Sequence, residues 1–209
     1  MPDLSLPPLL RGHLSSDPRA DAIAAAQDGC DGGTLLWRAD DGIEAALVLA
    51  PDVPLAQAAQ MGPLATLALR DAIGAIGPAE IPVHLDWANA IYVDGAIAGG
   101  VGVVAPKVDA QALPDWIAVH ASLGLDPSEP LAAVDPHDLL ESWSRHLVHR
   151  LSTWEDDGAA ALHADLQGAS WERETEDPRW IGRDETLGRL RRDGDATILD
   201  PLTDLLETP

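Results

Sequence analysis

The chain has 209 residues, of which 46% are hydrophobic, so it is long enough for one sizeable core and a small additional unit. Its formal net charge is −22, from 35 acidic and 13 basic residues, and Lys107 is the only lysine. Because a field this negative repels polyanions, we expect no nucleic-acid partner and no binding to anionic membrane surfaces.

The cysteine content and the hydropathy pattern bear on the compartment. Cys30 is the only cysteine, which excludes an intramolecular disulfide and fits a reducing environment. The first residues show no basic segment followed by an apolar run, and no stretch approaches the roughly 20 apolar residues that a membrane span needs. We therefore expect a cytoplasmic protein.

The first predicted elements are a helix and a pair of strands. Asp17 and Pro18 are typical of a helix N-cap and first helical position, and an Ala-rich helix follows until Gly29. Apolar runs at 34–37 and 43–50 are separated by turn residues and indicate two antiparallel strands.

A second helix is predicted over 54–76, followed by a strand at 81–85. The pair Gly62-Pro63 interrupts this helix, and we expect a kink there because proline removes one backbone donor and crowds the preceding turn. His84 and Asp86 are two residues apart and so share one face of the strand. A structural pair is the more common explanation of this spacing, and a pair for proton transfer or metal binding is the alternative.

A hairpin is the clearest local signal in the chain. Asp94 and Gly95 separate apolar runs at 91–93 and 96–104. A two-residue Asp-Gly turn between such runs is typical of a tight hairpin, because both turn positions need positive φ. A further strand is predicted over 116–125.

One more helix and a small β unit are predicted in the C-terminal part. Asp135 begins the helix, an apolar stripe marks one buried face, and Gly158 ends it. Beyond the helix, charge density rises and short strands are indicated at 186–190 and 196–199, around an Arg-Asp-Gly-Asp turn.

The order of these elements indicates an α+β fold, with a mixed, mostly antiparallel sheet and helices packed on it. We expect a main domain over 1–167 and a small β domain over 168–209, which is too short to hold a core of its own. No G-x-G-x-x-G follows a predicted strand, so a doubly wound dinucleotide-binding fold is not indicated.

The segment 86–100 carries the most specific motif. It reads Asp-Trp-Ala-Asn-Ala-Ile-Tyr-Val-Asp-Gly-Ala-Ile-Ala-Gly-Gly. It resembles the Lys-Trp-Pro-Asn-Asp-hydrophobic segment of the biotin/lipoate protein ligase superfamily, which continues through a hairpin into an Ala-Gly strand. The resemblance extends more loosely along most of the chain, including a C-terminal unit similar to the small SH3-like domain of those ligases. The positions that match at the family spacing are Trp87, Asn89, Gly95, Ala98 and Gly99.

This resemblance implies a function and a set of site residues. The implied reaction activates a small carboxylic acid, such as biotin or lipoate, with ATP and Mg²⁺ and transfers it to a lysine of a biotin or lipoyl carrier protein. The resemblance implies Asp86 and Asn89 as the catalytic residues, and no metal ligands are assigned. The residues assigned to ligand binding are Trp37, Arg38, Trp87, Gly99, Gly100 and His120.

Several family positions carry different residues here. Asp86 stands where the family has a lysine that contacts the acyl-adenylate, and Arg38 is the only basic residue in the short connection 38–42, where the family has an Arg- and Gly-rich loop. Two anions at about 4 Å repel by about 4 kcal/mol at an effective dielectric of about 20, so either a metal at Asp86 supplies charge or the pocket no longer runs adenylation. The sequence thus predicts a ligase or, alternatively, a non-catalytic binding or regulatory module that keeps the acid pocket. A protein-interaction domain is a third reading.

For two pairs of candidate residues, a purely structural role is the alternative to ligand binding. Trp37 and Trp87 either wall a ligand slot or pack ordinarily against the sheet, and packing is the more common role of buried tryptophan. Gly99 and Gly100 either let a ligand approach the backbone or mark a bulge. The family spacing places Trp87 and Asn89 just before the hairpin, at the mouth of a cleft.

Overall fold

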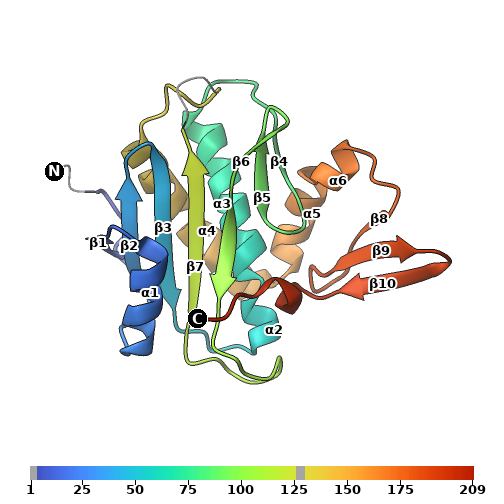
Figure 1. The fold of residues 1–209 in the computed structure, drawn as a ribbon, viewed down its shortest axis with the longest axis horizontal. Coiled ribbons are helices and arrows are strands. Elements are labelled where there is room, and N and C mark those ends of the chain that lie inside the picture. Colours follow the sequence, from blue (N-terminus) through green and yellow to red (C-terminus); the bar gives the residue numbers. More distant parts are fainter. Residues whose placement is uncertain (1–3, 126–129) are drawn as a thin grey trace.

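The computed structural model describes residues 4–125 and 130–209, which contain a seven-stranded sheet flanked by helices and a separate three-stranded sheet (Figure 1). The main sheet has the order β1-β2-β3-β7-β6-β5-β4, in which β1 is parallel to β2 and all other neighbours are antiparallel. The predicted α+β class with a mixed, mostly antiparallel sheet is confirmed. The strands of this sheet are β1 (Arg11–Leu14), β2 (Thr34–Ala39), β3 (Gly42–Leu49), β4 (Val83–Leu85), β5 (Ala90–Val93), β6 (Ala96–Val104) and β7 (Ile117–Gly124).

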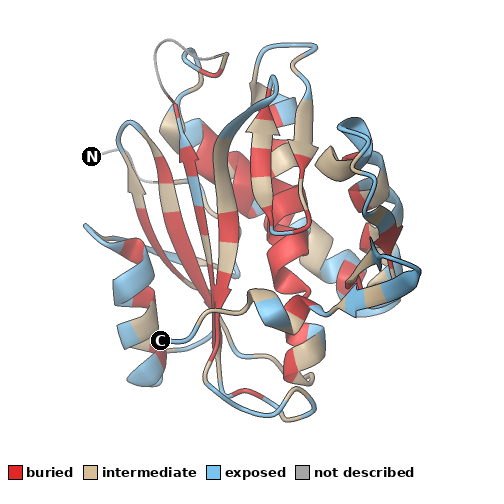
Figure 2. Ribbon diagram, turned by 45° about the vertical axis from the view of Figure 1, so that its right-hand side comes forward, coloured by how far each residue is buried: buried red, intermediate tan, exposed pale blue. Residues whose placement is uncertain are grey.

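The helices cover the two faces of this sheet unequally. The long helices α3 and α4 pack on one face, and α1 covers only part of the other (Figure 1). Most residues of α3 are buried, as the red helix behind the sheet shows (Figure 2). The helices are α1 (Pro18–Gln27), α2 (Leu55–Ala58), α3 (Met61–Ile76), α4 (Pro136–Asp157), α5 (Ala160–Gly168), α6 (Trp171–Glu174) and the 3-10 helix η1 (Leu202–Leu205).

The predicted helix starts are confirmed by their capping bonds. The Asp17 side chain accepts a hydrogen bond from the Ala20 amide at 3.1 Å, and the Asp135 side chain accepts one from the His137 amide at 2.8 Å. Each bond satisfies an amide that has no partner inside the helix. Helix α4 ends at Gly158, whose φ of +61° is readily adopted by glycine.

The single kinked helix predicted over 54–76 is wrong in detail. The structure has two helices, α2 and α3, and the break lies at Ala59 and Gln60. Pro63 falls in the first turn of α3, where the amide that proline lacks would have no helical partner. At the break, the Gln60 side chain accepts a hydrogen bond from the Trp154 indole at 2.7 Å, and this bond connects the end of α2 to α4.

The predicted Asp-Gly hairpin is confirmed. β5 and β6 are antiparallel, and Asp94 and Gly95 between them have φ values of +50° and +83°. The register of the two strands shifts between Ile91 and Tyr92, which is a bulge in the hairpin.

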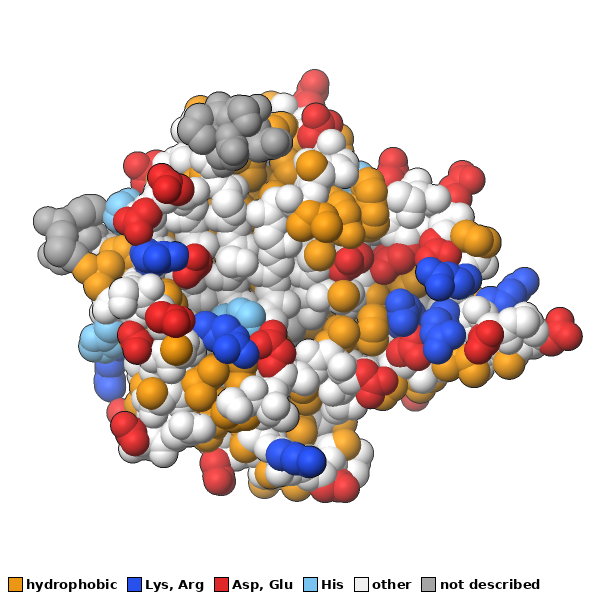
Figure 3. Space-filling view, viewed as in Figure 1, with side chains coloured by type: hydrophobic (Ala, Val, Ile, Leu, Met, Phe, Trp, Pro, Cys, Tyr) orange, Lys and Arg blue, Asp and Glu red, His pale blue; other side chains and the backbone are white. Residues whose placement is uncertain are grey.

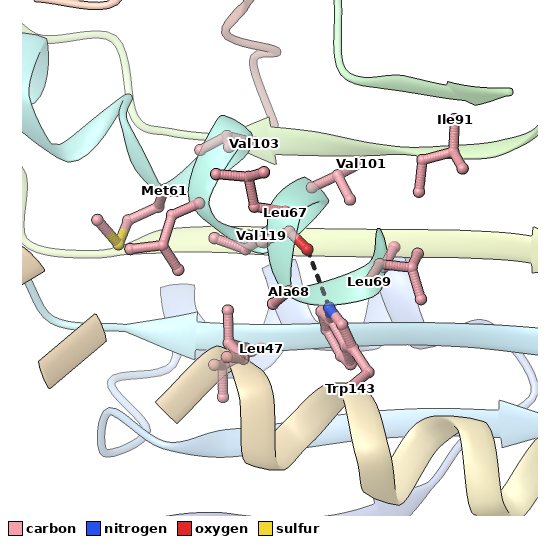
Figure 4. Packing of buried hydrophobic residues seen from close by; sticks show 14 of the residues in the cluster. Leu47, Met61, Leu67, Ala68, Leu69, Ile91, Val101, Val103, Val119 and Trp143 are labelled. Atoms are coloured by element: carbon pink, nitrogen blue, oxygen red, sulfur yellow. Dashed lines mark hydrogen bonds between the residues drawn. The ribbon is translucent and has the colours of Figure 1, made fainter. Parts of the chain in front are cut away.

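The core is built from aliphatic side chains and tryptophan. Trp143 of α4 is fully buried, and its indole N–H donates to the Ala65 carbonyl of α3 at 3.1 Å (Figure 4). Around this contact the two helices pack on the strands through residues such as Leu47 and Val119. The hydrogen bond satisfies the one polar atom of a large apolar side chain, so the tryptophan can be buried completely.

The C-terminal part forms a three-stranded antiparallel sheet of β8 (Trp180–Arg183), β9 (Arg189–Asp193) and β10 (Ala196–Asp200). The predicted strand at 196–199 is confirmed, whereas β9 begins later than the predicted strand at 186–190. This sheet contacts the main domain where the guanidinium of Arg189 lies 4.5 Å from the ring centroid of Trp87. The domain division at residue 167 and the likeness to an SH3-like domain stay predictions.

Candidate functional site

Strand pairing places two rows of residues across the face of the main sheet opposite α3 and α4. Directly paired residues in antiparallel strands share a face, and Arg38, Glu44, Ser122, Gly100 and Ala90 are paired in sequence from β2 to β5. The adjacent row on this face reads Leu36, Ala46, His120 and Gly102. At about 4.8 Å per strand, the row from Arg38 to Ala90 is about 19 Å long.

Small residues occupy the middle of this surface. Ser122 and Gly124 are exposed, although they lie on β7, the central strand of the sheet. Helix α1 packs on a cluster that includes Leu36, Ala46 and Ala118, and Ser122 and Gly124 lie outside this cluster. We call this surface the open face, and its residues are Arg38, Gly42, Glu44, Ala90, Gly100, Gly102, His120, Ser122 and Gly124.

The space-filling view shows the open face as a mostly white area of backbone and small side chains, with charged and hydrophobic groups around it (Figure 3). An antiparallel sheet normally covers its solvated face with long polar side chains. Here glycine and serine leave the backbone accessible instead, which gives a ligand room to lie directly on the strands.

Two hollows meet at Gly124, and their linings differ. One, of about 250 Å³, is lined largely by apolar residues of the β5–β6 hairpin, such as Val93 and Ile97, and by Leu131. The other, of about 260 Å³, is lined by charged residues of the β2–β3 turn, including Arg38 and Glu44. The side of the open face next to the hairpin therefore suits an apolar group, and the side next to the turn is polar.

The arginine at this polar side is already paired. Arg38 donates to Glu44 at 2.5 Å and lies 3.8 Å from the Asp40 carboxylate. With Asp41 next to them, these groups make the β2–β3 end of the open face more acidic than basic.

At the other end, His120 belongs to a second charged cluster. Its Nε2 atom lies 3.0 Å from Oε1 of Glu207, whose Oε2 accepts a hydrogen bond from Arg19 at 2.5 Å. Burial acts to raise the pKa of Glu207, but the hydrogen bonds from Arg19 and His120 outweigh it and lower that pKa. Glu207 thus carries its negative charge on the open face.

Three of the predicted site residues lie on the helix-covered side. Trp37 and Trp87 are 7% and 6% exposed and belong to the main core, so their side chains pack in the core and do not wall a slot on the open face. Asn89, also 6% exposed, has its amide against Gly62 of α3, where an added Cβ would be 2.9 Å from Nδ2. The expected cleft mouth at Trp87 and Asn89 is therefore closed by α3 and by Arg189.

Asp86 lies at the start of the hairpin, next to the C-terminal part. Its Oδ1 accepts a hydrogen bond from the Ala90 amide at 2.8 Å, and its Oδ2 accepts one from the Tyr92 hydroxyl at 3.3 Å. Burial raises the pKa of Asp86, the neighbouring Glu172 raises it further, and the two hydrogen bonds only partly oppose this. The suggested partner His84 instead lies 3.7 Å from Glu174 and packs on Trp171.

Gly99 and Gly100 have different surroundings. A Cβ on Gly99 would lie 2.0 Å from the Ser122 carbonyl oxygen, so the close approach of β7 requires glycine there. Gly99 also adjoins the hairpin bulge. Gly100 lies on the open face, where a Cβ would come within 3.0 Å of the Asn89 carbonyl oxygen. Of the predicted site residues, Arg38, Gly100 and His120 thus lie on the open face, without contacting one another.

Sequence reasoning missed Glu44, Ser122 and Glu207. The alternation in β7 signals the open face, because apolar residues alternate with His120, Ser122 and Gly124. No local signal connects Glu207 with His120, since they are 87 residues apart.

Within residues 4–125 and 130–209, no three His, Cys, Asp or Glu side chains are grouped so that they could hold a metal ion. In the same part of the chain, no helix is long and apolar enough to cross a membrane.

These features define an α+β protein whose central sheet has one face partly uncovered and rich in small residues. The model of the biotin/lipoate A/B protein ligase family matches residues 6–168, and the chain belongs to this family. The resemblance seen in segment 86–100 is thereby confirmed. No curated protein sequence gives a significant match.

Solved structures agree with this family assignment. A biotin protein ligase-like protein of unknown function from Silicibacter sp. TM1040 is 34% identical, with a TM-score of 0.89 and coverage of 98% of this chain and 100% of that chain. Biotin protein ligase from Aquifex aeolicus has a TM-score of 0.69 at 14% identity, covering 92% of this chain and 94% of that one. Biotin protein ligase from Leishmania major in complex with biotin has a TM-score of 0.57 at 11% identity, covering 93% and 98%. The last two likenesses show the shared fold.

Proposed function

We propose that the protein binds a small carboxylic acid of the biotin or lipoate class on its open face and activates it with ATP slowly or not at all. Family membership supports the class of ligand, as do the structures of the Aquifex aeolicus and Leishmania major ligases in complex with biotin. The observation that carries the proposal is the exposure of Ser122 and Gly124 on the central strand, beside Gly100 of β6.

The two hollows at Gly124 support an amphipathic ligand. The hollow at the hairpin offers the exposed side chain of Ile97 and the half-buried Ala98 to an apolar ring or acyl chain, whereas Val93 and Leu131 behind them belong to the main core. Burying such a group stabilises the complex by about 25 cal/mol per Å² of apolar surface removed from water. Polar groups of the ligand then face the strand backbone and the charged residues at either end of the open face.

The residues of the open face do not fit a triphosphate. Arg38 is neutralised by Glu44 and Asp40, and Arg19 is neutralised by Glu207. Asp86 adds a carboxylate where the family resemblance implies a lysine. Removing one preorganised charge-assisted contact from a transition state costs about 3–4 kcal/mol, which is a hundredfold or more in rate.

An active ligase is the second candidate, because family membership favours it. It would require ATP, Mg²⁺ and a carrier-protein lysine as acceptor. Acid-dependent pyrophosphate exchange separates this candidate from the proposed one.

A larger side chain at Ser122, in the middle of the open face, tests the proposed site. Ser122→Leu adds a bulky side chain on the exposed face of β7, and we expect it to weaken binding of octanoate, lipoate or biotin at least tenfold, or about 1.4 kcal/mol. Because Ser122 is exposed, we expect the free energy of unfolding to change by only about 0.5 kcal/mol. Isothermal titration calorimetry measures the affinities, and urea unfolding checks the fold.

Ser152→Leu is the matched control, because it makes the same change at an exposed position of α4. It should leave affinity unchanged. If Ser122→Leu binds the same acid as tightly as the wild type, the open face is not the binding site.

A further inference from the structure

The carboxylate of Glu207 is held on the open face by two basic groups from different elements. Arg19 of α1 donates to one of its oxygens at 2.5 Å, and Nε2 of His120 on β7 lies 3.0 Å from the other. Arginine and protonated imidazole both form charge-assisted hydrogen bonds with carboxylates, which are stronger than neutral ones. The arrangement is one that would also bind the carboxylate of a small acid.

Gly102 makes space for this cluster. A Cβ at this position would lie 2.3 Å from Nε2 of His120 and 2.4 Å from Oε1 of Glu207. Any other residue would therefore displace the imidazole or the carboxylate from the sheet. Glycine lets both groups lie against the backbone of β6.

The segment that carries Glu207 has few attachments to the main sheet. The Glu207 amide donates to the Val103 carbonyl at 2.9 Å, and its carbonyl accepts from the Ala105 amide at 3.0 Å. Together they make an isolated bridge to Val104, and the Glu207 side chain is 39% exposed. Because Leu206 next to it packs against the main core, Glu207 can leave Arg19 and His120 by rotation of its partly exposed side chain rather than by opening of the segment.

The cluster is continuous with the rest of the open face. His120, Ser122 and Gly124 lie on the same face of β7. At about 3.4 Å per residue, His120 is about 14 Å from Gly124, where the apolar hollow begins. A medium-chain acid with its carboxylate at His120 would extend over Ser122 toward that hollow.

We propose that Arg19 and His120 form a carboxylate-binding subsite of the open face, and that Glu207 fills this subsite until the carboxylate of a ligand displaces it. The inference rests on the proposed function, because it assigns one end of the same ligand. The apparent affinity for acids then equals the affinity of the free subsite multiplied by the fraction of molecules in which Glu207 does not occupy it.

Acetate carries a carboxylate but no long apolar chain, so it tests the subsite independently of the apolar hollow. In Glu207→Ala, we expect added acetate to shift the His120 imidazole resonance in NMR spectra with a midpoint at least tenfold lower than in the wild type. Glu155→Ala removes the same charge from an exposed position of α4 and should behave as the wild type. Adding Arg19→Gln to Glu207→Ala should abolish the acetate response. Equal acetate responses in the wild type and Glu207→Ala would overturn the proposal.

Octanoate and its neutral amide test the same subsite with a longer ligand. By calorimetry, Glu207→Ala should bind octanoate at least fivefold more tightly than the wild type does, with no gain for octanamide. An equal gain for both compounds would contradict a carboxylate subsite. Glu207→Gln, which removes the charge and keeps the size of the side chain, should also bind octanoate more tightly than the wild type does, so the test does not depend on the alanine variant alone.

The outcomes separate this inference from the proposed function. If acetate reaches His120 in Glu207→Ala but octanoate binds to no variant, the subsite stands and the proposed function fails. If octanoate binds to the wild type and to Glu207→Ala equally, and acetate acts equally on both, the proposed function stands and the subsite fails.

Discussion

Asp86 shows how one side chain changes the chemistry of a family position. Its carboxylate accepts hydrogen bonds from Ala90 and Tyr92, and burial raises its pKa, with a further contribution from Glu172. The nearby guanidinium of Arg183 is itself buried, which lowers its pKa. Asp86 thus stabilises the start of the hairpin but places a costly negative charge there.

The raised pKa predicts a pH-dependent stability. A carboxyl group whose pKa is higher in the folded than in the unfolded state contributes stability below its unfolded pKa of about 4, and this stability is lost as pH rises through the folded value. We therefore expect Asp86→Asn to gain stability relative to the wild type as the pH rises from about 4 to about 7.5. Urea unfolding at the two pH values measures the difference.

Asp156→Asn serves as the control for this comparison, because it removes the same charge from an exposed position of α4. The difference in free energy of unfolding between Asp156→Asn and the wild type should vary less with pH than the difference between Asp86→Asn and the wild type. A wild type that gains stability over Asp86→Asn as pH rises would show that the Asp86 pKa is lowered in the folded protein.

Sequence reasoning located some site residues and missed others for physical reasons. Arg38 and His120 were predicted and lie on the open face, whereas Trp37 and Trp87 pack in the core. An apolar aromatic gives the same sequence signal in a ligand slot and in a core, so its role depends on which face the strand buries. The contact between Glu207 and His120 depends on tertiary structure alone.

Among the elements, those with strong periodicity or capping signals were predicted well. Helices α1 and α4 begin at their predicted caps, and the β5–β6 hairpin lies where the Asp-Gly turn places it. Strand β1 was missed because all four of its residues are exposed and show no alternation. Helix α5 was missed because it follows the glycine that ends α4, although Leu162 and Leu166 are spaced as on a helix face.

The C-terminal elements contact the main domain at several points. Trp171 stacks on Tyr92 with ring centroids 4.4 Å apart, Arg189 lies over Trp87, and Leu187 and Leu202 are buried in the main core. These contacts support the prediction that the C-terminal part covers an existing core rather than forming its own.

Truncation after Gly168 tests this division. We expect a chain that still folds and melts cooperatively, with a free energy of unfolding lower by about 3 kcal/mol, because core side chains lose buried partners. Circular dichroism during thermal and urea unfolding gives both quantities. A truncated chain without a cooperative transition would place the C-terminal part inside the folding unit and refute a boundary at 167.

The whole molecule combines the fold of a ligase family with a strongly negative charge. The net charge is −22, and both Arg38 on the open face and Arg19 of α1 beside it are paired with acidic residues. Adenylation needs positive charge at the phosphates, whereas holding an acid on the strands needs mainly space and an apolar contact. The fold can therefore retain binding while the chemistry is lost.

Acid-dependent exchange of pyrophosphate into ATP is the most direct test of this claim, measured on a preparation whose acid binding has been confirmed by calorimetry. With octanoate, lipoate or biotin present at saturation, together with ATP and Mg²⁺, we predict saturable binding of at least one acid and no exchange above the rate without acid. Robust exchange that depends on the bound acid would contradict the account and show that the chain is an active ligase.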